Sequence, residues 1–256
     1  ESRGLGDVYK RQEEMPAYIQ DVLDLIEYAN GDARRTVWGR KRAEAGHPKP
    51  FNLKYIGIGN EDMITEVFEE RFAMIYKAVR EKHPEITVVG TVGPFYEGTD
   101  YAEGWRLATE LGVPMVDEHY YVDPGWMIHN QDYYDRYDRT KSKVYLGEYA
   151  AHLPGRPNNI ETALAEALYL TSVERNADVV RLATYAPLFA HVDAWQWNPD
   201  LIWFDNLRMM RTPNYYVQQM YGMNAGTDVL NLQMDGKPVT GQDSLYASAV
   251  LDAPTG

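Results

Sequence analysis

The chain has 256 residues, a length that suits one large domain or two of moderate size. Its 25 Lys and Arg against 38 Asp and Glu give a net charge of −13, which opposes binding to nucleic-acid phosphates or anionic lipid but suits a neutral substrate such as a sugar chain. Apolar residues make up 45% of the chain, enough for a core, and the lack of cysteine excludes disulfides, thiolate nucleophiles and cysteine-based zinc sites.

The first twelve residues, ESRGLGDVYKRQ, differ in character from the rest. They have neither the apolar segment nor the small-residue cleavage site of a signal peptide, and no helical or strand period. We interpret residues 1–12 as a non-native scar and exclude them from the fold. The natural N-terminus, the export route and the localisation therefore stay unknown.

Apolar periodicity divides the next hundred residues into alternating helices and strands. The predicted elements are a helix over 16–29, a long polar loop over 31–52, a strand over 54–61, a helix over 63–82, a strand over 86–92 and a helix over 100–111. Asn30-Gly31, Pro84 and Gly112 follow the three helices as stop signals.

The alternation continues through the second half of the chain. The predicted elements there are a strand over 116–121, an irregular Tyr- and Asp-rich tract over 127–140, a strand over 144–150, a helix over 160–175 and a strand over 179–187. The period of the 160–175 helix predicts one inward face, made of Ile160, Ala163, Leu164, Ala167, Leu168 and Thr171. Residues 229–233 and 245–251 read as antiparallel strands.

Strands that alternate with helices predict an α/β fold with a parallel sheet. The pattern contains five such strands, whereas a complete (β/α)8 barrel has eight in about 250 residues. The chain is therefore either a five-stranded open sheet or the C-terminal part of a barrel that lacks its first strands.

Two glutamates follow apolar strands at equivalent positions. Glu61 ends the strand over 54–61, and Glu148 lies near the end of the strand over 144–150. Each alone is explained by a helix cap or a partner arginine, because an unpaired carboxylate at a buried strand end is costly. Together, at the edge where parallel α/β folds bind ligands, they favour the carboxylate pair of glycoside hydrolysis.

Other catalytic patterns are missing from the sequence. Five histidines, His47, His83, His129, His152 and His191, are scattered without metal-ligand spacing, which argues against a zinc site. There is no dinucleotide fingerprint, no phosphate-binding loop and no serine nucleophile elbow. We expect neither a metal nor a cofactor.

Seven ordered segments resemble the catalytic domain of glycoside hydrolase family 51, the α-L-arabinofuranosidases. They are IQDVLDLIEYANGD at 19–32, AGHPKPFNLKYIGIGNED at 45–62, VDEHYY at 116–121, YLGEYA at 145–150, YAPLF at 185–189, WNPDLIWFDN at 197–206 and TPNYYVQQMYG at 212–222.

This resemblance implies a role for each site residue. Glu61, after the fourth barrel strand, would be the general acid/base, and Glu148, on the seventh, the nucleophile. Asn60 would bind the sugar 2-hydroxyl. Tyr121 would hydrogen-bond the nucleophile unless it only packs, and His119 would lie beside it as a substrate-binding residue. Three residues after the eighth strand would line the pocket mouth: Trp195, Trp197 and Asn198.

The resemblance also implies the architecture and the reaction. The fold would be an incomplete (β/α)8 TIM barrel, strands four to eight, over 13–222, followed by the start of an antiparallel β-sandwich over 223–256. The chain would then be a fragment of a longer enzyme. That enzyme would release terminal α-L-arabinofuranosyl residues from arabinan or arabinoxylan with retention, its two carboxyl groups about 5–5.5 Å apart. Its partner would be an arabinose-containing carbohydrate, and a homo-oligomer is compatible with the family.

Two alternatives stay open at this point. One is another retaining glycosidase of the same clan, acting on a β-linked glucan or xylan. The other is a sugar-binding fragment without turnover.

Overall fold

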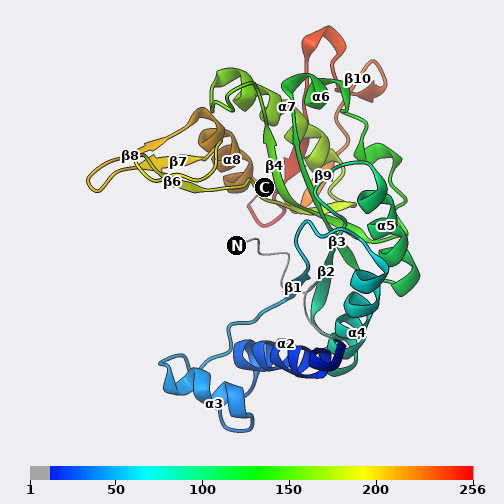
Figure 1. The fold of residues 1–256 in the computed structure, drawn as a ribbon. Coiled ribbons are helices and arrows are strands. Elements are labelled where there is room, and N and C mark those ends of the chain that lie inside the picture. Colours follow the sequence, from blue (N-terminus) through cyan, green and yellow to red (C-terminus); the bar gives the residue numbers. More distant parts are fainter. Residues whose placement is uncertain (1–11, 256) are drawn as a thin grey trace. The chain divides into compact units, whose positions relative to one another are not determined.

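A computed structural model describes residues 12–255 (Figure 1). The chain forms two compact units, which divide between Glu118 and His119, inside one strand. Each unit is described separately below. Most of the predicted scar, residues 1–11, lies outside the described residues.

The first unit alternates helices with parallel strands, as predicted. Its elements are η1 Gln12–Glu14, α2 Met15–Asn30, α3 Val37–Glu44, β1 Tyr55–Ile58, α4 Glu66–Lys82, β2 Thr87–Thr91, α5 Thr99–Leu111 and the first part of β3 Met115–Val122. β1 pairs in parallel with β2, and β2 with β3. Within the described residues, every helix is too short or too polar to span a bilayer.

Helix α4 covers this part of the sheet through an aromatic row. The Thr65 side chain caps the helix by accepting a hydrogen bond from the Phe68 amide. Phe68, Phe72 and Tyr76 then stack along one face, with ring centroids 5.8 and 6.2 Å apart. Gly90 of β2 makes room for this row, because a Cβ there would lie 2.8 Å from the Phe72 ring. The helical period predicted from the sequence is confirmed here.

The predicted loop over 31–52 is wrong in its middle, where α3 forms. Thr36 caps α3 by accepting from the Gly39 amide. The helix is anchored by Arg42, which is fully buried and donates to the carbonyl oxygens of Tyr28 and Gly31, both at 2.8 Å. The helix is held by one charged side chain that is hydrogen-bonded to backbone oxygens, and not by an apolar face. Its sequence therefore has no apolar period from which a helix could be predicted.

The second unit contains the rest of β3 and the elements after it. They are α6 Pro124–His129, η2 Tyr134–Arg136, β4 Lys143–Ala151, α7 Ile160–Arg175, β5 Val180–Ala183, β6 Phe189–His191, β7 Ile202–Phe204, β8 Met209–Arg211, α8 Pro213–Met223, β9 Asp228–Leu230, β10 Gln233–Met234, β11 Lys237–Pro238, η3 Gln242–Ser244 and β12 Ala249–Leu251.

The strands of the second unit form several sheets. The parallel strands follow in the order β3-β4-β5, which continues the predicted α/β alternation. β6, β7 and β8 form a separate three-stranded sheet, which the sequence pattern does not predict. β9 pairs antiparallel with β12, as predicted for the end of the chain, and β10 pairs with β11.

The predicted inward face of α7 is wrong for two of its residues. Ile160 is 66% exposed and Leu164 is 59% exposed. The buried face carries polar side chains instead, among them Glu166 and Ser172. Helix α7 contacts β4, α6 and α8, so more than one of its faces is buried. Hydrogen-bonded polar side chains therefore occupy buried positions that the apolar period assigns to the solvent-exposed face.

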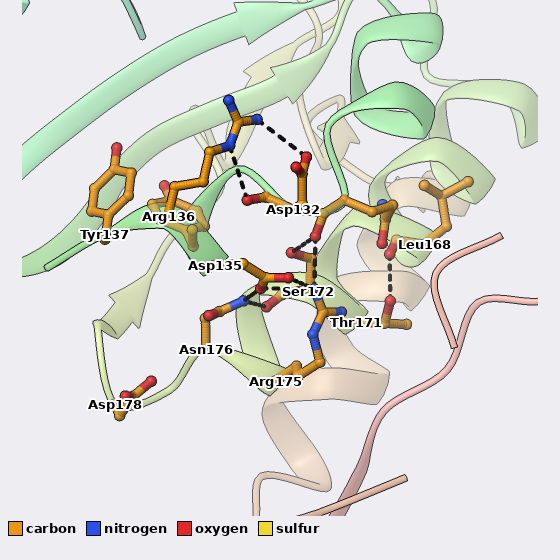
Figure 2. Close-up of polar contacts among 12 residues, drawn as sticks. Asp132, Asp135, Arg136, Tyr137, Leu168, Thr171, Ser172, Arg175, Asn176 and Asp178 are labelled. Atoms are coloured by element: carbon orange, nitrogen blue, oxygen red, sulfur yellow. Dashed lines mark hydrogen bonds and ion pairs between the residues drawn. The ribbon is translucent and has the colours of Figure 1, made fainter. Parts of the chain in front are cut away.

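Polar contacts join α7 to the Tyr- and Asp-rich tract (Figure 2). Asp135 accepts hydrogen bonds from the Arg175 guanidinium, at 2.9 Å, and from the side-chain Nδ2 of Asn176, at 2.7 Å. Ser172 donates to the carbonyl oxygen of Gln131 at 2.7 Å. The tract lacks a period because these bonds and tyrosine packing, rather than an apolar stripe, hold it against α7.

Candidate functional site

Glu148 lies on β4, among residues that are otherwise buried. Its side chain is 31% exposed, whereas the next residue, Tyr149, is fully buried and donates to Gln218 at 2.7 Å. Successive side chains of a strand point to opposite faces, so burial of Tyr149 turns Glu148 toward the other face. The strand thus holds one carboxylate in a fixed position with access to solvent.

Two residues of β3 contact this carboxylate. The Tyr121 hydroxyl donates to Glu148 Oε2 at 2.6 Å, and His119 Nδ1 lies 3.7 Å from the same oxygen. His119 is only 3% exposed, so its ring is fixed by packing. A hydrogen bond from a hydroxyl group orients a carboxylate. The structure therefore brings together three of the five residues predicted for the site.

Two aromatic side chains pack against Tyr121. The Tyr121 ring stacks on His152, with centroids 4.9 Å apart and planes 16° apart, and lies 5.4 Å from the Trp197 ring. Burial, reinforced by the nearby Arg156 cation, lowers the pKa of His152 to about 4. His152 is therefore a neutral aromatic partner for Tyr121 above that pH.

His152 and Arg156 also belong to this cluster, although the sequence pattern does not predict them there. His152 directly follows β4, four residues after Glu148, and Arg156 lies in the loop beyond it. Their positions at a strand end are the signal that could have found them, because ligands meet parallel α/β sheets there.

Asn60 and Glu61 lie in the first unit, in a tight turn after β1. Gly59 and Glu61 both have positive φ, 85° and 56°. The Asn60 amide donates to Asp62 Oδ2 at 2.7 Å, and a Cβ on Gly59 would lie 2.6 Å from that oxygen. A positive φ at a non-glycine residue is uncommon and is often retained at functional sites.

Asn60 and Glu61 thus belong to one unit, and His119, Tyr121 and Glu148 to the other. The separation of the two carboxyl groups stays a prediction.

Behind the site, Glu166 of α7 holds the end of β4. Its Oε1 accepts from the Ala151 amide at 3.0 Å, and its Oε2 accepts from Asn214 of α8 at 2.7 Å. Burial raises the pKa of Glu166 to about 7, although both hydrogen bonds act in the opposite direction. A buried, ionisable group therefore links the strand that carries Glu148 to two helices.

This link predicts a pH-dependent stability. The pKa of Glu166 rises from 4.5 to about 7 on folding, so the folded state binds the proton more tightly. The stabilisation is therefore present below pH 4.5 and is lost as pH rises through about 7, a change of roughly 3 kcal/mol in the free energy of unfolding. Urea unfolding of the wild type at pH 4.5 and pH 8 measures it.

The matched variant is Glu166→Gln, which cannot ionise. It should lose this part of the pH dependence, while Glu161→Gln, at the exposed start of α7, should keep it. The side-chain oxygen of the new glutamine can still accept the hydrogen bond from the Ala151 backbone amide. Its side-chain NH2 group can donate to Asn214 Oδ1 if the Asn214 amide flips, because that oxygen is buried and has no partner among the described residues. Parallel pH profiles for the wild type and Glu166→Gln would show that Glu166 is not the titrating group.

Two family models match the chain. The α-L-arabinofuranosidase 1 domain matches residues 3–139, more than half of the chain, and the α-L-arabinofuranosidase C-terminal domain matches residues 130–247.

Curated relatives agree with these models. The chain is similar to an extracellular exo-α-L-arabinofuranosidase of Streptomyces chartreusis, with 47% identity over 83% of this chain and 25% of the relative. It is also similar to α-L-arabinofuranosidase 2 of Arabidopsis thaliana, with 31% identity over 91% of this chain and 32% of the relative. The chain thus spans about a quarter to a third of the length of these relatives.

Two solved structures share the fold of this chain. An arabinose-bound MgGH51 α-L-arabinofuranosidase matches with a TM-score of 0.80 and 26% identity, over 96% of this chain and 39% of that one. A family 51 α-L-arabinofuranosidase of Bifidobacterium longum shares the fold, with a TM-score of 0.63 and 14% identity over 84% of this chain and 54% of that one. The five parallel strands fit an incomplete (β/α)8 barrel followed by antiparallel sheets, as predicted.

Proposed function

The chain belongs to glycoside hydrolase family 51, the α-L-arabinofuranosidases. We propose that the full-length protein that contains this chain releases terminal α-L-arabinofuranosyl residues from arabinose-containing carbohydrates, with retention of the anomeric configuration. The observation that carries this proposal is the hydrogen bond from Tyr121 to Glu148, 2.6 Å long, in the second half of parallel strand β4. A partly exposed carboxylate held in this way is suited to attack an anomeric carbon.

In the proposed mechanism, Glu148 Oε attacks the anomeric carbon, the glycosidic C–O bond breaks, and an arabinosyl ester forms on Glu148. Glu61 donates its proton to the leaving oxygen. A water molecule then attacks the same carbon, Glu61 takes the proton from that water, and the ester bond breaks to return the Glu148 carboxylate. Two inversions give net retention.

The neighbouring residues have supporting roles in this proposal. Tyr121 keeps the attacking carboxylate oriented, and the buried ring of His119 lies 3.7 Å from the same oxygen. Asn60, directly before Glu61, binds the sugar 2-hydroxyl, a contact that strengthens as the transition state forms. In this proposal, residues 13–222 belong to the partial catalytic barrel and residues 223–256 to the start of the C-terminal β-domain.

A panel of nitrophenyl glycosides tests this function on the full-length protein. We expect hydrolysis of the α-L-arabinofuranoside and at most weak activity on the β-D-xylopyranoside and β-D-glucopyranoside. Proton NMR should show the retained anomer as the first product. Faster cleavage of a β-linked pyranoside would instead support another retaining glycosidase, and sugar binding without any hydrolysis would support a non-catalytic protein.

A further inference from the structure

Helix α8 has two polar side chains that are buried against α7 and β4. Asn214 and Gln218 are four residues apart, so they lie on the same side of the helix. Asn214 is fully buried, and the Nε2 atom of Gln218 is buried without a partner among residues 12–255. Burying polar groups costs free energy unless they are hydrogen-bonded. The proposed mechanism uses neither residue, so the helix that contains them is without a stated role.

Gln218 contacts the residue next to the proposed nucleophile. Its Oε1 accepts the hydrogen bond of the Tyr149 hydroxyl at 2.7 Å. Burial raises the pKa of Tyr149 well above its usual value, so the hydroxyl keeps its proton and acts as the donor. Glu148 and Tyr149 are joined by one planar peptide bond, and their side chains point to opposite faces of β4. A displacement of Tyr149 therefore also displaces Glu148.

A second contact from α8 fixes the main chain of β4. Asn214 Nδ2 donates to Glu166 Oε2 at 2.7 Å, and Glu166 Oε1 accepts from the Ala151 backbone amide at 3.0 Å. The strand is therefore attached to α8 at the first and the third residue after Glu148. A hydrogen bond restricts both distance and direction, whereas apolar packing is non-directional.

Helix α8 is itself held at both ends. Thr212 caps its first turn and donates to the Leu201 carbonyl oxygen at 3.0 Å. Toward the other end, the Tyr221 hydroxyl donates to the Ala167 carbonyl oxygen of α7 at 2.8 Å. The helix thus provides a fixed reference for the strand that it contacts.

We propose that Gln218 is a positioning residue for the nucleophile and acts through Tyr149 to set the place of Glu148. The inference rests on the proposed function and adds to it a residue from the opposite face of the strand. Attack requires the carboxylate oxygen to be aligned with the anomeric carbon at about 3–3.5 Å, and an error of about 1 Å costs on the order of 10²-fold in rate. The 2.6 Å hydrogen bond from Tyr121 depends on the same position.

The test measures kcat/KM of the full-length protein on a dinitrophenyl arabinofuranoside. This substrate reports the attack by Glu148, because its leaving group needs no general acid. Gln218→Met removes the acceptor oxygen at nearly constant side-chain length and should lower kcat/KM by roughly tenfold, as expected for a displacement of less than 1 Å. Gln218→Glu keeps an oxygen that can accept from Tyr149 and should recover most of the loss.

The double variant Tyr149→Phe/Gln218→Met separates positioning from stabilisation. Gln218→Met alone leaves the Tyr149 hydroxyl buried without its acceptor, so it should also lower the urea midpoint of unfolding. The double variant should restore the midpoint, because apolar groups of similar shape replace both polar partners. Its kcat/KM should stay low, since the hydrogen bond that sets the strand is still missing.

Gln219→Met makes the same change on a different face of α8 and is the matched control, with the kcat/KM and the midpoint of the wild type expected. A double variant that regains the wild-type rate together with its stability would show a purely structural role and overturn the inference. A wild-type kcat/KM for Gln218→Met would also overturn it. A wild type that hydrolyses no arabinofuranoside would overturn the proposed function, and the inference with it.

Discussion

Replacement of Glu148 by Gln should lower kcat on an arabinofuranoside by roughly 10⁴-fold or more, the scale on which a covalent nucleophile contributes. The variant keeps the size and position of the side chain, and Tyr121 can still donate to its amide oxygen. It lacks the charge that attacks the anomeric carbon. Steady-state rates with a nitrophenyl arabinofuranoside measure the loss.

The smaller variant Glu148→Ala separates a lost nucleophile from a misfolded site. The space it leaves can hold azide, which should attack the substrate in one step and release the arabinosyl azide of inverted configuration. Glu161→Gln, on the exposed start of α7, is the control and should have the wild-type rate. A Glu148→Gln protein within tenfold of the wild type would remove Glu148 from the mechanism.

The second large effect is expected at Glu61, and it depends on the leaving group. Glu61→Ala should reduce hydrolysis of an arabino-oligosaccharide by roughly 10²- to 10⁴-fold, because its leaving oxygen needs a proton from a general acid. A dinitrophenyl arabinofuranoside has a leaving group that needs no proton, so the first step should stay fast. Hydrolysis of the arabinosyl-enzyme should become slow, since the general base is missing as well.

Azide again provides a distinguishing measurement. It needs no general base, so it should accelerate turnover of Glu61→Ala and give the arabinosyl azide of retained configuration. Glu66→Ala, in the first turn of α4, is the matched control. Equal losses in kcat/KM, which reports the first step, on the oligosaccharide and the dinitrophenyl substrate would contradict an acid/base role for Glu61.

The sequence predicted the α/β alternation because the helices and strands of this core carry clear apolar periods. β2 and β3 bury nearly every residue, and α4 buries Phe68, Phe72 and Ile75 at helical spacing. Periodicity failed where polar side chains are buried with partners. Arg42 anchors α3 inside a predicted loop, and Glu166 lies on the buried face of α7 while Leu164 is exposed.

The candidate site also contains residues that the sequence predicts and contacts that it does not. Glu61 and Glu148 are recognisable from the sequence because Glu61 follows an apolar strand and Glu148 lies near the end of another. The family resemblance adds Asn60, His119 and Tyr121. The contacts of His152 and Trp197 with Tyr121 depend on how the loops after β4 and β6 fold. Those loops have no period, and their hydrogen bonds join residues about forty positions apart, so sequence pattern cannot place them.

Covalent trapping tests the central claim most directly. Glu61→Ala should be mixed with the dinitrophenyl arabinofuranoside, quenched in acid and digested, because this variant forms the arabinosyl-enzyme quickly and loses it slowly. Peptide mass spectrometry should then find one arabinosyl residue on the peptide that contains Glu148, and on Glu148 itself after fragmentation. An arabinosyl group on a different carboxylate, or rapid turnover with the inverted anomer and no adduct, would contradict the account.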